Sequence, residues 1–164
     1  MTTVPRPCTP ATSAPSPWLP RVEDAGLNAS APSEQRVFDG WLVRFSPGKA
    51  KRARCVNTLA PGRLPLEDKL AQLQAFYREQ GLPMFIRITP FSEPADLDAR
   101  LAALGWTTLD DTRVMVCPSL EALHAEPWPG GQSLHEVDSS RFAEAVGGLR
   151  GSPAAQRSAH ARRL

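Results

Sequence analysis

The stretch that decides the fold is DGWLVRFSPGKAKRARCVNTL, residues Asp39–Leu59. Its WLVRF portion alternates its side chains between two faces, which is the period-two pattern of a half-buried strand. A Ser-Pro-Gly turn comes next at residues 46–48, because proline fixes φ and glycine accepts a positive φ at no steric cost. A second extended run covers residues 52–57. We therefore expect a β-hairpin whose first arm is apolar and whose turn and second arm are basic.

The composition is that of an ordinary globular protein. The chain has 164 residues, of which 41% are hydrophobic and 22% charged, enough for one domain, or for one small domain plus part of another. The formal net charge is only +2, so overall charge does not favour a nucleic-acid partner. No apolar run approaches the roughly 20 residues of a membrane span, and the N-terminus lacks the apolar core of a signal peptide. We expect a cytoplasmic protein that does not associate with a membrane.

The cysteines and histidines do not form a metal-binding pattern. Cys8, Cys55 and Cys117 are odd in number and widely spaced, without a C-x-x-C pair, and the histidines supply no clustered ligand spacing. We expect no metal site and reduced thiols, as in a cytoplasmic protein.

Helical and extended segments alternate along the rest of the chain. Residues 1–20 are rich in Pro, Thr, Ser and Ala and predict a disordered tail, because they cannot bury enough apolar surface to offset the entropy of ordering. Residues 64–83 carry apolar side chains at i, i+4, i+7 and i+11, the stripe of an amphipathic helix that Gly81 should end. The other expected elements are a helix at 21–29, a strand at 84–89, a helix at 92–105 capped by Ser92 or Glu93, an extended segment at 106–116 with a strand at 113–116, and a short helix at 119–126.

This order predicts the domain organisation. Strand, strand, helix, strand, helix and strand together indicate an α/β or α+β fold, with a central sheet and helices packed on it. We assign residues 21–126 to this N-terminal domain and the Pro- and Gly-rich residues 127–131 to a linker. Residues 132–164 then predict a strand at 133–137, a helix at 142–149 capped by Ser139 or Ser140, and a helix at 154–163. No strand comes after these helices for them to cover, so we interpret residues 132–164 as the opening of a second, incomplete domain.

At this point the sequence resembles a known family. The segment from residue 39 to residue 83 is similar to the N-terminal half of bacterial GNAT-superfamily N-acetyltransferases built from two tandem GNAT-like halves. In that group a DGW-L-R strand leads to a Gly turn, a K-R-A-N-S-V-N-type strand, a helix ending in F-Y-x-x-x-G-L-P, and a strand reading F-R-x-T. The matching residues are Trp41, Arg44, Gly48, Lys51, Arg52, Ala53, Val56, Asn57, Phe76, Tyr77, Gly81, Leu82, Pro83, Arg87 and Thr89. The resemblance covers about residues 23–121 and continues more loosely to residue 164; it departs at Arg54 and Cys55, where the group more often has Asn and Ser.

The resemblance implies a GNAT-like fold, a mostly antiparallel sheet flanked by helices in the order β-β-α-β-α-β, with an incomplete second unit after it. It also implies acetyl transfer from acetyl-CoA to an amine, whose identity the sequence does not specify. In the superfamily a Q/R-x-x-G-x-G/A loop offers backbone N–H groups to the cofactor's pyrophosphate. Residues 44–50 are one residue too long and lead into a strand, and residues 147–153 come after a helix and reach a proline. We therefore assign no catalytic and no cofactor-binding residue, and expect weak or no activity unless a partner chain or a missing C-terminal half completes the enzyme.

The basic hairpin supplies the candidate contacts for an anion or substrate, namely Arg44, Lys51, Arg52 and Asn57. The alternative for its lysines and arginines is a solvated sheet edge, where such charges discourage edge-to-edge pairing. The resemblance suggests Tyr77 as a general acid, but its place on the apolar helix stripe favours a core role. Cys55 lies beside arginines that would activate a thiolate, yet no base accompanies it, so a buried small hydrophobe is the better interpretation.

Two further functions stay open beside the acetyltransferase. One is a non-catalytic GNAT-like module that packs against a partner and shapes its acceptor cleft. The other is a small nucleic-acid-binding domain that uses the basic hairpin, whose binding would weaken with salt.

Overall fold

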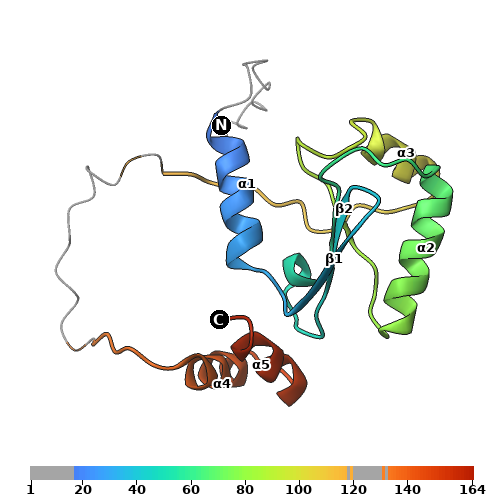
Figure 1. The fold of residues 1–164 in the computed structure, drawn as a ribbon. Helices are drawn as coiled ribbons and strands as arrows, with labels where there is room; N and C mark the ends of the chain where they lie inside the picture. The colour runs from blue at the N-terminus through green and yellow to red at the C-terminus, as the bar shows by residue number, and fades with distance from the viewer. Residues whose placement is uncertain (1–16, 118, 120–130, 132) are drawn as a thin grey trace, which may run out of the picture.

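The computed structural model describes residues 17–117, 119, 131 and 133–164, and within them the fold is α+β, as expected. Figure 1 shows the elements in chain order. Their bounds are α1 Trp18–Ala29, β1 Glu34–Phe38, β2 Trp41–Phe45, the 3₁₀ helix η1 Lys51–Arg54, β3 Val56–Asn57, α2 Leu66–Glu79, β4 Ile86–Arg87, α3 Leu97–Ala103, α4 Ser139–Leu149 and α5 Ala154–Ala161.

The described strands form a four-stranded mixed sheet in the order β1-β2-β3-β4. β1 and β2 pair antiparallel, as do β2 and β3, whereas β3 and β4 run parallel. The tight hairpin is β1–β2, and its two-residue turn is Asp39-Gly40, with φ values of 44° and 83°. Positive φ at both positions matches the twist of the flanking strands, which explains why this turn closes the hairpin.

The position of the hairpin turn is a correction to the sequence prediction. Residues 46–48 do not join two long arms, because the chain continues into η1 and returns to the sheet only at β3. The prediction that residues 52–57 form an extended arm of the hairpin was therefore wrong, except for Val56 and Asn57, which pair with β2. Within η1 the Ala53 methyl group is buried, whereas Arg52 is exposed. The short 3₁₀ helix therefore has an apolar side and a basic side, as the expected strand would have had.

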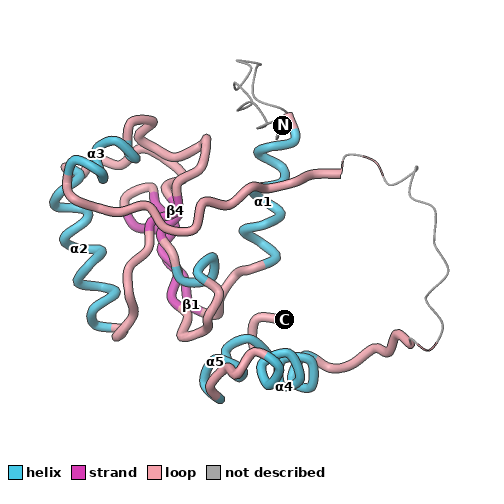
Figure 2. The backbone as a smooth tube through the Cα atoms, turned by 180° about the vertical axis from the view of Figure 1, so that it is seen from behind, coloured by secondary structure: helices cyan, strands magenta, loops and turns pink. Residues whose placement is uncertain are grey.

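The core lies between the sheet and α2, which carries the predicted apolar stripe. Figures 1 and 2 show α2 and α3 on one side of the sheet and α1 on the other. The side chains in this cluster expose 8% or less of their surface; they are Trp41, Val43, Phe45, Val56, Leu66, Leu70, Leu73, Tyr77, Leu97 and Leu101. Gly81 ends α2 with φ of 63°, which confirms the predicted αL stop.

A buried ion pair fixes the turn between β1 and β2. Lys69 of α2 places its Nζ 3.1 Å from a carboxylate oxygen of Asp39 and 3.8 Å from the centroid of the Trp41 ring. The same carboxylate accepts hydrogen bonds from the backbone N–H groups of residues 63 and 64, the first of which is the main cause that lowers the pKa of Asp39. Turn, helix and the loop before that helix are thus tied together at one point.

The segment after α2 departs from the expected pattern at two places. α3 begins at Leu97, preceded by Asp96, so neither Ser92 nor Glu93 caps it; the Ser92 hydroxyl instead accepts a hydrogen bond from the Thr89 N–H. The strand expected at 113–116 is also wrong, since none of these residues pairs with the sheet and Met115 exposes 93% of its surface. An apolar extended pattern forms a strand only where a neighbouring edge offers hydrogen bonds.

The C-terminal segment forms two helices, α4 and α5. Asp138 caps α4 by accepting a hydrogen bond from the Arg141 N–H at 2.8 Å, one residue before the predicted Ser139. Residues 133–137 do not form the expected strand. The expected helix at 119–126 and linker at 127–131 fall almost wholly outside the described residues. None of the helices among the described residues is long and apolar enough to cross a membrane.

Candidate functional site

Arg44 lies beneath α1 and exposes 2% of its surface. Its Nη2 donates to the Leu27 carbonyl at 2.8 Å, and its Nε donates to the Gln35 side chain at 3.1 Å. Burial lowers the pKa of the Arg44 guanidinium. The contact with Leu27 satisfies a carbonyl near the C-terminus of α1, where a cation is favourable. Arg44 therefore joins α1 to the sheet, and it lies in the interior of the protein.

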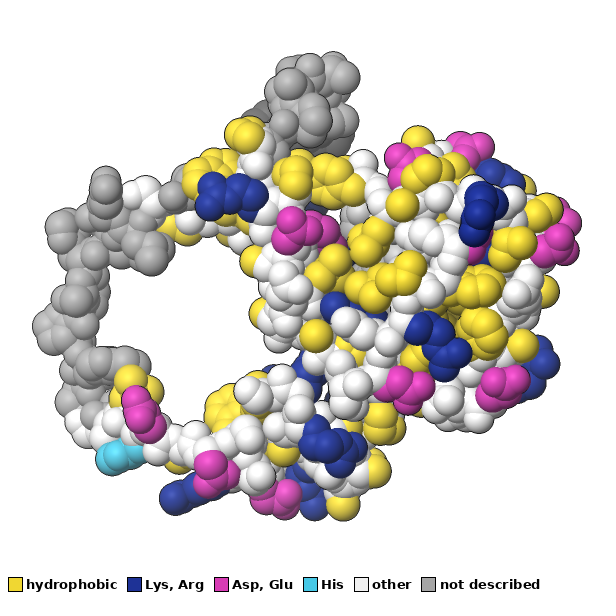
Figure 3. Space-filling view, viewed as in Figure 1, with side chains coloured by type: hydrophobic (Ala, Val, Ile, Leu, Met, Phe, Trp, Pro, Cys, Tyr) yellow, Lys and Arg dark blue, Asp and Glu magenta, His cyan; other side chains and the backbone are white. Residues whose placement is uncertain are grey.

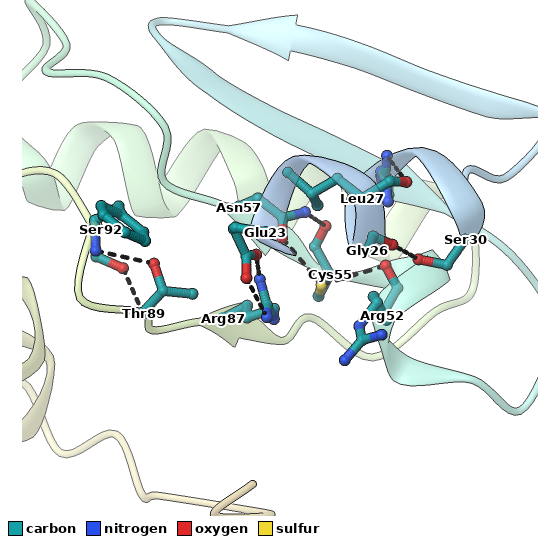
Figure 4. A network of polar contacts seen from close by, with 12 residues as sticks. Glu23, Gly26, Leu27, Ser30, Arg52, Cys55, Asn57, Arg87, Thr89 and Ser92 are labelled. Atoms are coloured by element: carbon teal, nitrogen blue, oxygen red, sulfur yellow. Dashed lines mark hydrogen bonds and ion pairs between the residues drawn. The ribbon is translucent and has the colours of Figure 1, made fainter. Parts of the chain in front are cut away.

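Cys55 and Asn57 occupy the same buried region, shown in Figure 4. The Cys55 thiol faces the Arg52 carbonyl at 3.6 Å, and the Asn57 amide donates to the Cys55 carbonyl at 3.4 Å. Burial raises the pKa of Cys55 to about 11, although the nearby Arg44 charge opposes this. A thiol with so high a pKa stays protonated at neutral pH and is a poor nucleophile. The interpretation of Cys55 as a buried small residue is confirmed.

A second link joins α1 to the sheet. The Arg87 Nη2 of β4 donates to the Glu23 carboxylate of α1 at 2.9 Å, and Figure 4 shows this pair beside the separate contacts between Asn57 and Cys55. Burial lowers the pKa of Arg87 as well. The polar residues on this face of the sheet thus serve as the attachment surface for α1.

The four predicted contacts differ in how far they are buried. Arg44 and Asn57 are buried under α1, whereas Arg52 is exposed. Lys51 forms an exposed ion pair with Asp110, in the extended segment after α3. Arg44 and Asn57 are closed off from solvent by burial, whereas the side chains of Arg52 and Lys51 reach the surface.

Tyr77 lies in the core, as its place on the α2 stripe predicted. Its hydroxyl donates to the Arg44 carbonyl at 2.8 Å, and its ring centroid is 5.1 Å from that of Phe45. Burial, the largest cause, raises its pKa. With 1% of its surface exposed, Tyr77 holds α2 against β2.

A basic pocket that the sequence did not predict lies where residues 46–53 meet α4 and α5. Its volume is about 280 Å³. Figure 3 shows Lys and Arg side chains over α4 and α5 and where these helices meet the main body. The charged and titratable side chains that line the pocket are Lys49, Arg150, Arg157, His160 and Arg163. No Asp or Glu among the described residues lines it.

The basic pocket could have been anticipated only in part. Arg150, Arg157 and Arg163 lie close together near the end of the sequence, so a basic C-terminal segment can be recognised. Their approach to Lys49, roughly a hundred residues earlier, depends on tertiary packing. Within the described residues, no group of three or more His, Cys, Asp or Glu could hold a metal ion.

Comparison with known proteins gives no relative: no protein-family model matches the chain, and neither a curated protein nor a solved structure matches it significantly.

Proposed function

We propose that this chain is the N-terminal half, with the first helices of the second half, of a two-half GNAT-type N-acetyltransferase. The observation that carries the proposal is the ordered resemblance of residues 39–89, from the DGW strand to the F-R-x-T strand. The general α+β class is compatible with that assignment, but the expected order β-β-α-β-α-β is not observed, because three strands come before α2 and no described strand comes after α3. The proposed reaction is attack of an amine on the thioester of acetyl-CoA.

In this proposal the described part of the chain is a scaffold. Tyr77 and Cys55, which were considered as a general acid and as a nucleophile, are both buried in the core, and burial raises the pKa of each. The loop that would bind the cofactor's pyrophosphate would come from polypeptide beyond residue 164 or from a partner chain. The scaffold would supply one wall of the acceptor cleft.

A non-catalytic GNAT-like module is the second candidate, and the same burial of Tyr77 and Cys55 favours it. The two candidates differ in the sequence encoded after codon 164. A Q/R-x-x-G-x-G/A sequence encoded downstream in any frame is expected for the enzyme and not for the module.

Two measurements test the proposal. Isothermal titration of the 164-residue chain with acetyl-CoA should give no detectable binding, and the chain extended through a downstream loop should bind it and acetylate an amine from a mixed panel. Micromolar binding of acetyl-CoA to the short chain would contradict the scaffold role. An extended chain that binds no acetyl-CoA would contradict the assignment to the acetyltransferases.

A further inference from the structure

The basic pocket between residues 46–53 and α4–α5 holds positive charge that the described residues do not neutralise. Lys49, Arg150 and Arg163 line it and form no ion pair within the described part of the chain. Like charges gathered around one hollow repel each other, and this repulsion is relieved when an anion enters. An ordinary solvated surface would intersperse acidic side chains among them.

Arg157 is held in place on the wall of the same pocket. Its Nε donates to the Glu144 carboxylate at 2.9 Å, and its Nη1 donates to the Ser152 carbonyl at 2.6 Å. Its aliphatic stem crosses Gly147, where a Cβ would come within 2.4 Å of the Arg157 Cγ. Gly147 therefore permits the crossing, and these contacts fix the guanidinium. A guanidinium fixed in this way loses little side-chain entropy when it binds a ligand.

The main body supplies the opposite wall. The buried Ser46 accepts a hydrogen bond from the Gly48 N–H at 3.1 Å, and Gly48 lies against Ala159 of α5. The Ser46 hydroxyl keeps its own proton to donate to a ligand oxygen. Ala50 and Ala53 line the rest of this wall, and Ala159 of α5 also lines the pocket, so the charges surround a surface that is partly apolar.

We propose that this pocket binds a small dianionic phosphate, either inorganic phosphate or the phosphate of a monoester. The volume of about 280 Å³ is just below the usual range for ligand pockets, which suits a compact anion better than a nucleotide. Arginine guanidinium groups and a serine hydroxyl are donors that phosphate oxygens accept well. The proposal concerns the pocket alone, and it stands whether or not the chain belongs to an acetyltransferase.

The test is isothermal titration of the full chain with inorganic phosphate, methyl phosphate and dimethyl phosphate at constant ionic strength. The test variant is Lys49→Ala/Arg150→Ala/Arg163→Ala, which removes the unpaired cations of the pocket. The control variant is Arg78→Ala/Arg100→Ala/Arg141→Ala, which removes exposed arginines outside the pocket. Each triple variant changes the net charge from +2 to −1, because each loses three positive side chains. Thermal unfolding of both variants checks that they fold.

The wild-type chain and the control variant should bind inorganic phosphate and methyl phosphate with a Kd below about 1 mM. The pocket variant should bind both at least about tenfold more weakly. Dimethyl phosphate, which carries a single charge, should bind the wild-type chain at least about tenfold more weakly than methyl phosphate. Equal phosphate affinity in the two triple variants would overturn the assignment to this pocket. Equal affinity for the mono- and diester would overturn the preference for a dianion and point to a phosphodiester, as in nucleic acid.

Discussion

Replacing Tyr77 with phenylalanine separates a structural role from a catalytic one. The change removes the hydroxyl that donates to the Arg44 carbonyl at 2.8 Å and keeps the ring that packs against Phe45. A buried hydrogen bond of this kind contributes about 1–2 kcal/mol to the free energy of unfolding. For a chain of this length, that loss lowers the melting temperature by about 2–8 °C. Tyr77→Ala, which also removes the ring, should cost about 3–5 kcal/mol.

The assay is urea unfolding of wild-type, Tyr77→Phe and Tyr77→Ala chains, monitored by tryptophan fluorescence. Trp41 exposes 1% of its surface, so its emission should report loss of the core. The expected result is a lower midpoint at an unchanged slope for Tyr77→Phe and a much lower midpoint for Tyr77→Ala. A Tyr77→Phe chain as stable as the wild type would refute the structural role. It would also restore Tyr77 as a candidate general acid in the extended enzyme.

Three further predictions concern the turn, the buried thiol and the exposed ion pair. Gly40→Ala should cost at least about 1 kcal/mol more than Gly105→Ala, since both glycines have φ of 83° but only a Cβ at Gly40 would meet two carbonyl oxygens at 2.8 Å; equal losses in urea titrations would contradict this. Between about pH 9 and pH 11 the free energy of unfolding should fall more steeply for the wild type than for Cys55→Ala, because burial raises the pKa of Cys55 to about 11 and the unfolded thiol loses its proton at lower pH. Parallel pH curves for the two proteins would show that the thiol is not buried in its protonated form. Lys51→Ala should lower the free energy of unfolding by at most about 1 kcal/mol, since its ion pair with Asp110 is exposed; a loss as large as that of a core substitution would show that the pair is structural.

The elements that depend on local chemistry could be predicted from the sequence. The α2 helix has a continuous apolar stripe and a glycine stop, and both are present in the structure. The β2 strand has strict alternation, and its Trp41, Val43 and Phe45 side chains enter the core. Such periodicities depend only on residues close together in the sequence, so they can be recognised without knowing the tertiary fold.

The elements that depend on distant partners could not be predicted in this way. The run at 113–116 has the composition of a strand, but none of the described strands pairs with it. The Asp39-Gly40 dipeptide is a strong hairpin signal that reasoning from the Ser-Pro-Gly sequence overlooked. Arg44 was predicted as a contact for an anion or substrate, but in the structure it is buried and donates to the Leu27 carbonyl of α1.

The candidate site likewise has a part that the sequence shows and a part that depends on tertiary contacts. The basic residues of η1 are visible as a cluster in the sequence, and Lys51 and Arg54 stay together over the Phe85 ring, but Arg44 is buried under α1. The basic pocket arises because α5 lies against Gly48, a contact between segments about a hundred residues apart that no local pattern encodes.

The central claim is that ligand chemistry belongs to the basic pocket, while the buried polar residues under α1 hold the fold. A titration with inorganic phosphate, monitored residue by residue in ¹H–¹⁵N correlation spectra, tests this claim most directly. The amide signals of Gly48 and Gly147, both in the lining of the pocket, should shift progressively, and those of Cys55 and Asn57 should stay in place. Shifts centred on Cys55 and Asn57, with Gly48 and Gly147 unchanged, would contradict the account.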